Sequence, residues 1–462
     1  MRADVLLIFP PLNYTERRVF PPLGLAYIAS VLENVGIHVG IIDSPALHLS
    51  CEHIIRIIKR KHPEIIGIQT AFHTFNECKN LIEMIRNFLP DSHIILGGHL
   101  PSSFPHRALT EAHSADMCVI GEGEYTMLEL VNALSKNLPL EKIKGLALKK
   151  DKNVYVTPYR EPIRNLNSLP FPARHLLPMK MYRFLPHEFK RSPVVTMLSS
   201  RGCPFRCTFC SKPNFNNSYR VRSPQNVISE IIEVVNHYSA KEIFFVDSVF
   251  GLYKSWCEKF CEHLIQEKLD ITWSCQTRID LMNKELLANM AASGCRSILF
   301  GIESCSQRLL DMLNKPIPMS KVMKIVKFAK DMGISVRASF IIGLPTETKK
   351  ETLQTIKFAK ELDPDFVQFH LFVPFEGTAI YEFSKRTGVF LDGTGDFDLP
   401  EKVKFVPHTY NSKNELIRIQ KFAYKNFYLN LKKIPEIIFK IRSLDNFKAW
   451  LSISDLIRSI IY

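Results

Sequence analysis

The strongest signal in this chain is the segment Ser200-Arg201-Gly202-Cys203-Pro204-Phe205-Arg206-Cys207-Thr208-Phe209-Cys210. Its three cysteines are separated by three residues and then by two, on one short loop. Soft thiolate sulfur suits iron–sulfur chemistry, so the three can hold three corners of a 4Fe–4S cube. The fourth iron is then open to bind a small molecule and pass it an electron. Buried or zinc-binding cysteines are the alternative, but zinc takes a fourth Cys or His at a regular spacing, and none stands nearby.

The surroundings of this loop predict a barrel. Apolar segments with strand character are Val194–Leu198, Glu242–Asp247, Ile271–Gln276, Ser297–Ile302, Val336–Ile342 and Phe366–Leu371. Helical patterns fall between them, and six βα units in a row predict a partial (β/α)6 barrel. In such barrels the chemistry lies on loops at the carboxyl ends of the strands. The cysteine loop, Asp247, Glu303 and Gly343 all fall at such ends.

The cysteine spacing, with an aromatic residue just before the third cysteine, resembles the signature of the radical S-adenosylmethionine (SAM) superfamily. The resemblance implies that Cys203, Cys207 and Cys210 are the catalytic and metal-binding residues. It also implies that SAM chelates the open iron through its amino and carboxylate groups. The reduced cluster would then split SAM to methionine and a 5′-deoxyadenosyl radical.

The same resemblance implies further SAM-binding residues. Phe209 is expected to place its backbone against adenine, and Ile341-Ile342-Gly343 matches an adenine-contacting strand, although Gly343 is equally consistent with a tight turn. Asp247 is expected to accept hydrogen bonds from the SAM amino group. The related pattern is often Asp-Asp-x-Phe, whereas here it is Asp247-Ser248-Val249-Phe250, so one carboxylate is missing. The alternative for Asp247 is a cap of the next helix.

Glu303, in Gly301-Ile302-Glu303-Ser304, is expected to point into the mouth of the barrel. There it would bind the ribose hydroxyls of SAM or pair with Arg278 or Arg337. A buried carboxylate without a partner is costly, so we expect one of these contacts.

The first 140 residues predict a doubly wound parallel sheet. Strands are expected at Val5–Phe9, His38–Ile42, Ile65–Gln69, His93–Leu96 and Met117–Ile120, with helices between them. Glycines follow the last two strands, as Gly97-Gly98-His99-Leu100-Pro101 and Gly121-Glu122-Gly123-Glu124. Glycines at such ends let a flat ligand approach the backbone.

Together with Pro10-Pro11 and Pro21-Pro22-Leu23-Gly24, these glycine turns resemble the cobalamin-binding domain that precedes many radical SAM domains. The resemblance implies bound cobalamin with Gly97, Gly98, Gly121 and Gly123 as binding residues. Two features depart from it. The Asp-x-His-x-x-Gly motif that supplies a lower cobalt ligand is absent, so we expect no histidine ligand, His99 included. Gln69 stands where many relatives have a small hydroxyl residue.

We predict an α/β protein with four parts: a cobalamin-binding-like domain (1–140), a proline-rich connector (141–190), a radical SAM core (191–400) and a helical C-terminal extension (401–462). Helical patterns at Ile434–Ile441 and Leu451–Ile461 mix apolar and basic residues. An apolar stripe at helical spacing usually packs on its own protein, and peripheral membrane contact is the alternative.

Composition limits the remaining possibilities. No apolar run reaches 18 residues, and eleven cysteines without a secretion signal favour a reducing, cytoplasmic compartment. Of these, Cys257 and Cys261 lie four apart on a predicted helix, where packing is preferred to a second cluster. The net charge of +14 suits an anionic substrate or an acidic redox partner such as a flavodoxin or ferredoxin. No nucleic-acid motif is present, so RNA is only a minor alternative as a partner.

The whole pattern resembles cobalamin-dependent radical SAM enzymes, which include methyltransferases and anaerobic cyclases. We therefore expect a methyltransferase that modifies an unactivated carbon of an unidentified substrate. A radical oxidative cyclase or rearranging enzyme would carry the same cofactors. A methylthiotransferase ranks lower, because Cys51, Cys78 and Cys118 form no second cluster motif. A non-catalytic cobalamin sensor also ranks low, since all three loop cysteines are retained.

Overall fold

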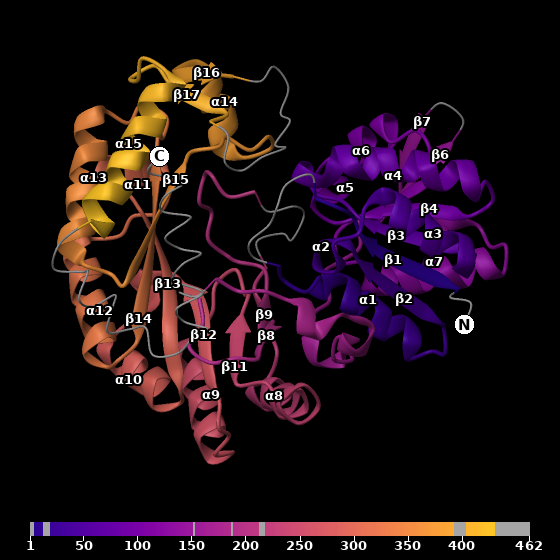
Figure 1. Ribbon diagram of the computed structural model, residues 1–462, viewed down its shortest axis with the longest axis horizontal. Coiled ribbons are helices and arrows are strands. Elements are labelled where there is room, and N and C mark those ends of the chain that lie inside the picture. The colour runs from indigo at the N-terminus through magenta and orange to yellow at the C-terminus, as the bar shows by residue number, and fades with distance from the viewer. Residues whose placement is uncertain are drawn as a thin grey trace. The chain divides into compact units, whose positions relative to one another are not determined.

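The computed structural model (Figure 1) describes residues 4–12, 19–150, 153–185, 188–211, 218–391 and 403–429. The chain forms two compact units, the first extending to Phe184 and the second starting at Leu185. Each unit is built on a wholly or largely parallel β-sheet with helices between its parallel strands, so the predicted α/β class is confirmed. No helix in these described ranges combines the length and the hydropathy needed to cross a bilayer.

The sheet of the first unit has the order β2-β1-β3-β4-β5-β6-β7. Its parallel strands are β1 (Val5–Phe9), β2 (Val39–Asp43), β3 (Ile65–Gln69), β4 (His93–Gly97) and β5 (Met117–Val119). Its helices are α1 (Leu23–Glu33), α2 (Ser44–Leu47), α3 (Cys51–Lys61), α4 (Phe75–Phe88), α5 (His99–Ser103), α6 (Pro105–Glu111) and α7 (Glu124–Ser135). The strand order reverses between β1 and β3, which is the topological switch point where such sheets bind ligands.

Helices cover both faces of this sheet, which explains why β1 is apolar at consecutive positions. Leu6 and Ile8 enter one buried cluster, together with side chains of α3 and α4. Val5 and Leu7 enter another, with side chains of α1 and α7. The core therefore lies on both sides of the sheet, and the carboxyl edge is left to loops.

Two segments differ from the sequence predictions. Residues 146–156 were expected in an irregular connector, but they form the antiparallel hairpin β6 (Leu146–Lys150) and β7 (Asn153–Val156). The sheet therefore extends beyond residue 140, because β5 offers an edge with which β6 can pair. The segment after Gly98 was expected as a turn but begins α5, and Pro105 then occupies the first turn of α6, where its missing N–H is tolerated.

The second unit contains a six-stranded parallel sheet in the order β15-β14-β13-β12-β11-β8. Its strands are β8 (Val194–Met197), β11 (Glu242–Phe245), β12 (Thr272–Thr277), β13 (Cys295–Glu303), β14 (Ser335–Ile342) and β15 (Phe366–Leu371). The helices are α8 (Pro224–Tyr238), α9 (Lys254–Gln266), α10 (Lys284–Ala292), α11 (Gln307–Met312), α12 (Met319–Asp331), α13 (Lys349–Leu362), α14 (Ala379–Thr387) and α15 (Lys413–Tyr428). This is the partial barrel predicted from the βα repeat.

Helix α15 protects the open edge of this sheet at β15 (Figure 1). The N–H of Val367 donates to the Tyr428 hydroxyl at 3.0 Å, and that hydroxyl donates to the Val367 carbonyl at 3.0 Å. Tyr424 makes the same pair of contacts with Phe369. Tyrosines four residues apart thus satisfy an edge that would otherwise pair with other chains. Helix α15 is the described part of the predicted helical tail; the predicted helices at 434–441 and 451–461 lie outside the described residues.

Candidate active site

The cysteine loop begins at the carboxyl end of β8. Strand β9 (Ser200–Arg201) pairs with β10 (Arg220–Val221), and Gly202 then turns the chain with a φ of +84°. A Cβ at Gly202 would lie 1.8 Å from the Ser218 carbonyl oxygen, so only glycine permits this close approach. The loop is therefore folded back on its own hairpin before its first cysteine.

All three cysteines of this loop are at least partly accessible to solvent. Cys203 and Cys207 are half-buried and Cys210 is exposed, and no disulfide joins any of the eleven cysteines. Among the described residues no three His, Cys, Asp or Glu side chains converge on a point that would hold a single metal ion. A 4Fe–4S cube does not require such convergence, because each thiolate binds a different iron. Three cysteines on one accessible loop fit the cube.

Backbone contacts from distant parts of the unit hold this loop. The N–H of Thr208 donates to the Leu313 carbonyl at 3.0 Å, and its hydroxyl donates to the Met312 carbonyl at 3.1 Å. The N–H of Ile380 donates to the Thr208 carbonyl at 3.1 Å. These partners follow β13 and β15, so the loop is fixed at the carboxyl end of the barrel sheet, where the sequence predicted it.

Asp247, at the carboxyl end of β11, is fully buried. Its carboxylate accepts hydrogen bonds from the Ser199 N–H at 3.1 Å, from the Ser199 hydroxyl at 2.8 Å and from the Ser200 hydroxyl. Burial outweighs these bonds and raises the pKa of Asp247. The helix-cap alternative is wrong, because the residue that precedes α9 is Tyr253. In the structure Asp247 anchors the start of the cysteine loop, and its contact with SAM stays a prediction.

Glu303 ends β13 in the left-handed region, with a φ of +69°. Its carboxylate pairs with the Lys315 ammonium at 2.6 Å, and the two side chains are only 8% and 7% exposed. The prediction that Glu303 pairs with Arg278 or Arg337 was wrong, since each of these arginines pairs with another carboxylate. A positive φ is uncommon for a residue other than glycine.

Gly343 forms a tight turn after β14, with a φ of +82°. Its N–H donates to the Glu347 carboxylate at 2.6 Å, and the Leu344 N–H donates to the same oxygen at 3.0 Å. Burial raises the pKa of Glu347 to about 7. The turn is thus stabilised by a residue that we did not single out, although an acidic residue four positions after a glycine is a recognisable signal. Contact of Gly343 with adenine stays a prediction.

Phe209 packs its side chain against a buried apolar cluster. The cluster draws on the end of β14 and on the segments after β13, β14 and β15, and it consists of Leu309, Leu313, Ile341, Leu344, Phe372, Ile380 and Phe405. This wall adjoins the cysteine loop and excludes water from one side of it. The predicted contact between the Phe209 backbone and adenine is not decided by this packing.

The four glycines predicted to bind cobalamin fall into two pairs. A Cβ at Gly97 or Gly121 would meet no other described residue within 4 Å, so both offer open space for a ligand at the carboxyl edge. A Cβ at Gly98, whose φ is +106°, would lie 2.9 Å from the Thr70 carbonyl oxygen, and one at Gly123 would lie 2.9 Å from Ile28. Close packing therefore explains why glycine is required at Gly98 and Gly123. Gly97 and Gly121 fit a surface on which the corrin could lie.

Two titratable residues lie at the same carboxyl edge. Asp43, at the end of β2, caps α2 through the Ala46 N–H and accepts a hydrogen bond from the Tyr182 hydroxyl at 2.8 Å. Burial raises the pKa of Asp43 to about 6. His99 begins α5, and burial lowers its pKa, which favours the neutral imidazole.

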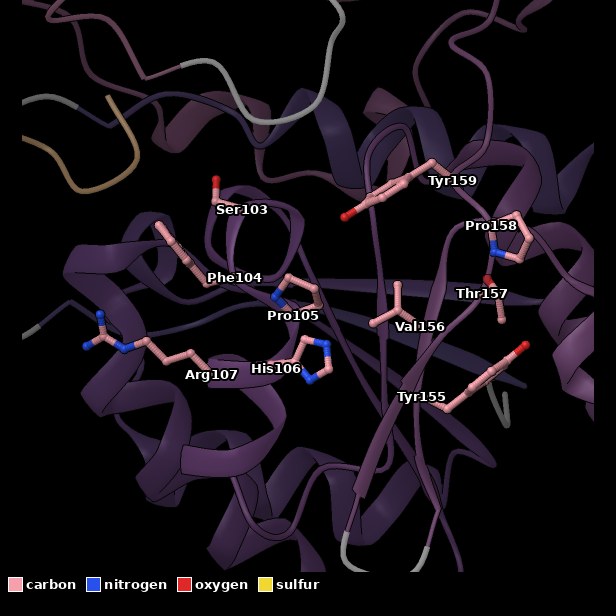
Figure 2. Close-up of a pocket in the computed structure, with 10 residues that line it drawn as sticks. All are labelled: Ser103, Phe104, Pro105, His106, Arg107, Tyr155, Val156, Thr157, Pro158 and Tyr159. Atoms are coloured by element: carbon pink, nitrogen blue, oxygen red, sulfur yellow. The ribbon is translucent and has the colours of Figure 1, made fainter. Parts of the chain in front are cut away.

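A pocket of about 790 Å³ also opens at this edge, where β7 ends (Figure 2). Figure 2 shows two groups of lining residues, one from the junction of α5 and α6 and one from β7 and the segment after it. The lining residues are Ser103, Phe104, Pro105, His106, Arg107, Tyr155, Val156, Thr157, Pro158 and Tyr159. The set contains no cysteine or carboxylate, so the cysteine chemistry does not belong to this pocket.

Comparison with known proteins bears on both units. Residues 197–359 match the radical SAM superfamily, and residues 16–131 match the B12 binding domain. An uncharacterized methyltransferase of Pyrococcus horikoshii is 34% identical over 442 residues, covering 94% of this chain and 95% of that protein. The anaerobic magnesium-protoporphyrin IX monomethyl ester cyclase of Rubrivivax gelatinosus is 29% identical over 424 residues, covering 89% of this chain and 74% of that protein.

A solved structure is similar over nearly the whole chain. It is that of the cobalamin-dependent SAM radical enzyme OxsB with aqua-cobalamin and SAM bound. The TM-score is 0.78 at 18% sequence identity, covering 99% of this chain and 71% of that chain. At this identity the likeness concerns the fold.

A six-stranded parallel barrel sheet with a three-cysteine loop at its carboxyl end defines a radical SAM enzyme. The chain belongs to the cobalamin-dependent radical SAM enzymes, a methyltransferase-like group in which a B12-binding domain precedes the radical SAM domain. Its cofactors are a 4Fe–4S cluster, SAM and cobalamin. The family and the cofactors predicted from the sequence are therefore confirmed, whereas the residues that bind them stay predictions.

Proposed function

We propose that Cys203, Cys207 and Cys210 bind the 4Fe–4S cluster and that this enzyme methylates an unactivated carbon of its substrate. When bound, the cluster and SAM supply the radical that removes hydrogen from carbon, and cobalamin supplies the methyl group. The observation that carries the proposal is the anchoring of an accessible three-cysteine loop at the carboxyl end of the barrel sheet.

The chain's own residues prepare this site. The bonds from Ser199 and Ser200 to Asp247 fix where the loop starts, and the bonds of Thr208 fix its middle. The apolar wall around Phe209 keeps water from one side, which protects a reactive radical from side reactions. In the first unit, Gly97 and Gly121 leave the backbone accessible to the flat face of cobalamin.

A second candidate function is a radical oxidative cyclisation or rearrangement. The likeness to an anaerobic cyclase over 89% of this chain favours it, because the same layout serves both reactions. The methyltransferase remains first, because the relative at 34% identity is named as an uncharacterized methyltransferase.

A reductant is needed to load the cluster with an electron, and a flavodoxin or ferredoxin suits the net charge of +14. The same charge favours an anionic substrate.

Anaerobic incubation of the reconstituted full chain with dithionite and methyl-labelled SAM tests these functions. Cleavage of SAM together with label in a product of an anaerobic cell extract supports methyl transfer. Cleavage with an altered but unlabelled product supports the cyclase or rearranging enzyme. A chain that binds cobalamin but cleaves no SAM would be a sensor and would overturn the proposal.

A further inference from the structure

Arg278 lies beside the cysteine loop, one residue after β12. Its Nη1 lies 3.5 Å from the Cys207 Sγ and donates a hydrogen bond to it. Its guanidinium also lies over the Phe205 ring, 3.9 Å from the ring centroid. Phe205 and Cys207 belong to the same loop, so one cation from the segment after β12 contacts two residues of that loop. The side chain is only 10% exposed, so solvent screens its charge weakly.

Asp280 fixes the direction of this guanidinium. Nε and Nη2 of Arg278 each donate to one carboxylate oxygen of Asp280, both at 3.0 Å. The planar fork of arginine then leaves Nη1 aimed at sulfur. The Lys321 ammonium donates to the Asp280 carbonyl at 2.5 Å and holds the backbone beneath this pair.

We propose that Arg278 is a positioning residue of the cluster, which holds the Cys207 thiolate by a charge-assisted hydrogen bond and raises the reduction potential of the cluster. Reduction adds one negative charge to the cluster, and a cation beside a ligand sulfur stabilises the reduced form. Hydrogen bonds to sulfur and net charge are both known determinants of iron–sulfur potentials. The inference rests on the proposed function in one respect, the assignment of the cluster to the loop cysteines.

The test is a redox titration of the reconstituted full chain, followed by paramagnetic resonance of the reduced cluster. Arg278→Gln should lower the reduced-to-oxidised ratio at fixed potential about tenfold, a downward shift of about 59 mV for one electron. Asp280→Asn should shift the potential upward, because the same cation then lacks its compensating charge. Arg278→Lys should recover part of the loss, since it keeps the charge but not the planar fork.

Opposite signs in these two variants separate electrostatic tuning from a general loosening of the loop, which would move both potentials in one direction. Arg191→Gln is the matched control, because Arg191 makes a similar bidentate ion pair with the exposed Asp270. The reduction potential of the cluster in this variant should equal that of the wild type. If Arg278→Gln fails to hold the cluster, Asp280→Asn and Arg278→Lys still show whether the charge at this position raises or lowers the reduction potential of the cluster.

Equal potentials in wild type, Arg278→Gln and Asp280→Asn would overturn the inference. So would an unchanged potential with weakened SAM binding in Arg278→Gln, which would make Arg278 a SAM ligand. A wild-type chain that holds no cluster on its loop cysteines would refute the proposed function itself.

Discussion

Replacement of Asp247 by Ala separates the two roles that this residue has been given. The substitution removes the carboxylate that accepts hydrogen bonds from the Ser199 N–H and from the Ser199 and Ser200 hydroxyls. All three donors are buried. The hydroxyls can rotate toward other acceptors, but the backbone N–H cannot. A buried donor without a partner costs about 1–3 kcal/mol, so we expect Asp247→Ala to lower the free energy of unfolding by about 2–4 kcal/mol in all.

Asp247→Asn should cost far less. Its amide oxygen still accepts one of these bonds, and the neutral amide avoids the burial of charge that raises the pKa of Asp247. The loop should therefore keep its position in Asp247→Asn and lose it in Asp247→Ala. Iron per chain after anaerobic reconstitution, together with urea unfolding, measures the two effects.

Asp270→Ala is the matched control, because Asp270 is an exposed aspartate of the same unit that pairs with Arg191 and Lys241. Exposed pairs of this kind contribute about 0–1 kcal/mol. Asp247→Ala protein with full iron content and unchanged stability, but with weaker SAM binding in calorimetry, would refute the anchoring argument. It would instead establish the SAM contact expected from the sequence.

Three further predictions concern the loop cysteines and two buried carboxyl groups. Ala at any loop cysteine should remove a cluster of about four irons, whereas Cys257→Ala should leave the iron content unchanged; a wild-type count near eight irons would contradict this. Lys315→Met should cost about 3–5 kcal/mol in urea unfolding because Glu303 stays buried unpaired, and an added Glu303→Gln should restore most of it; no difference between single and double variants would count against the pair. Burial raises the pKa of Asp43 from 3.8 to about 6, so its protonated carboxyl stabilises the fold below about pH 4. This contribution of about 3 kcal/mol is lost as pH rises through 6. Thermal unfolding of Asp43→Asn as a function of pH should lack this decline in stability, and a decline identical to that of the wild type would exclude Asp43 as its source.

The order of strands and helices could be predicted because buried positions are apolar and recur in the sequence with a spacing typical of each kind of element. Strands covered on both faces, such as β1, are continuous apolar runs. Some helices end shortly before a glycine, as α1 does before Gly36 and α12 before Gly333. The cysteine loop could also be predicted from the sequence, since its three cysteines lie within a segment of eight residues. Local patterns of this kind do not depend on which distant segments fold together.

The hairpin Leu146–Val156 was missed for the opposite reason. Its residues alternate only weakly, and they form strands because the exposed edge of β5 is available for pairing. Prolines at 158 and 162 follow the hairpin and made the whole region resemble an irregular connector. Tertiary context overrode the local composition.

Partners of charged residues were also beyond local patterns. Glu303 pairs with Lys315, twelve positions away, whereas the two expected arginines, Arg278 and Arg337, pair with Asp280 and Glu188. Asp247 finds its donors 47 and 48 positions upstream. The sequence places such groups at the correct end of the barrel, but which pairs form depends on side-chain directions set by bulges and left-handed turns, such as that at Glu303.

These pairings bear on how SAM is recognised. The carboxylates of Asp247 and Glu303 and the guanidinium of Arg278 each have partners within the polypeptide. A SAM amino group that used Asp247 would have to reach a fully buried carboxylate and displace a bond that fixes the cysteine loop. Recognition through backbone carbonyls at the strand ends requires no such exchange, since a carbonyl has two lone pairs and can accept a second bond. The structure thus favours SAM binding by the backbone, with the buried charges holding that backbone in place.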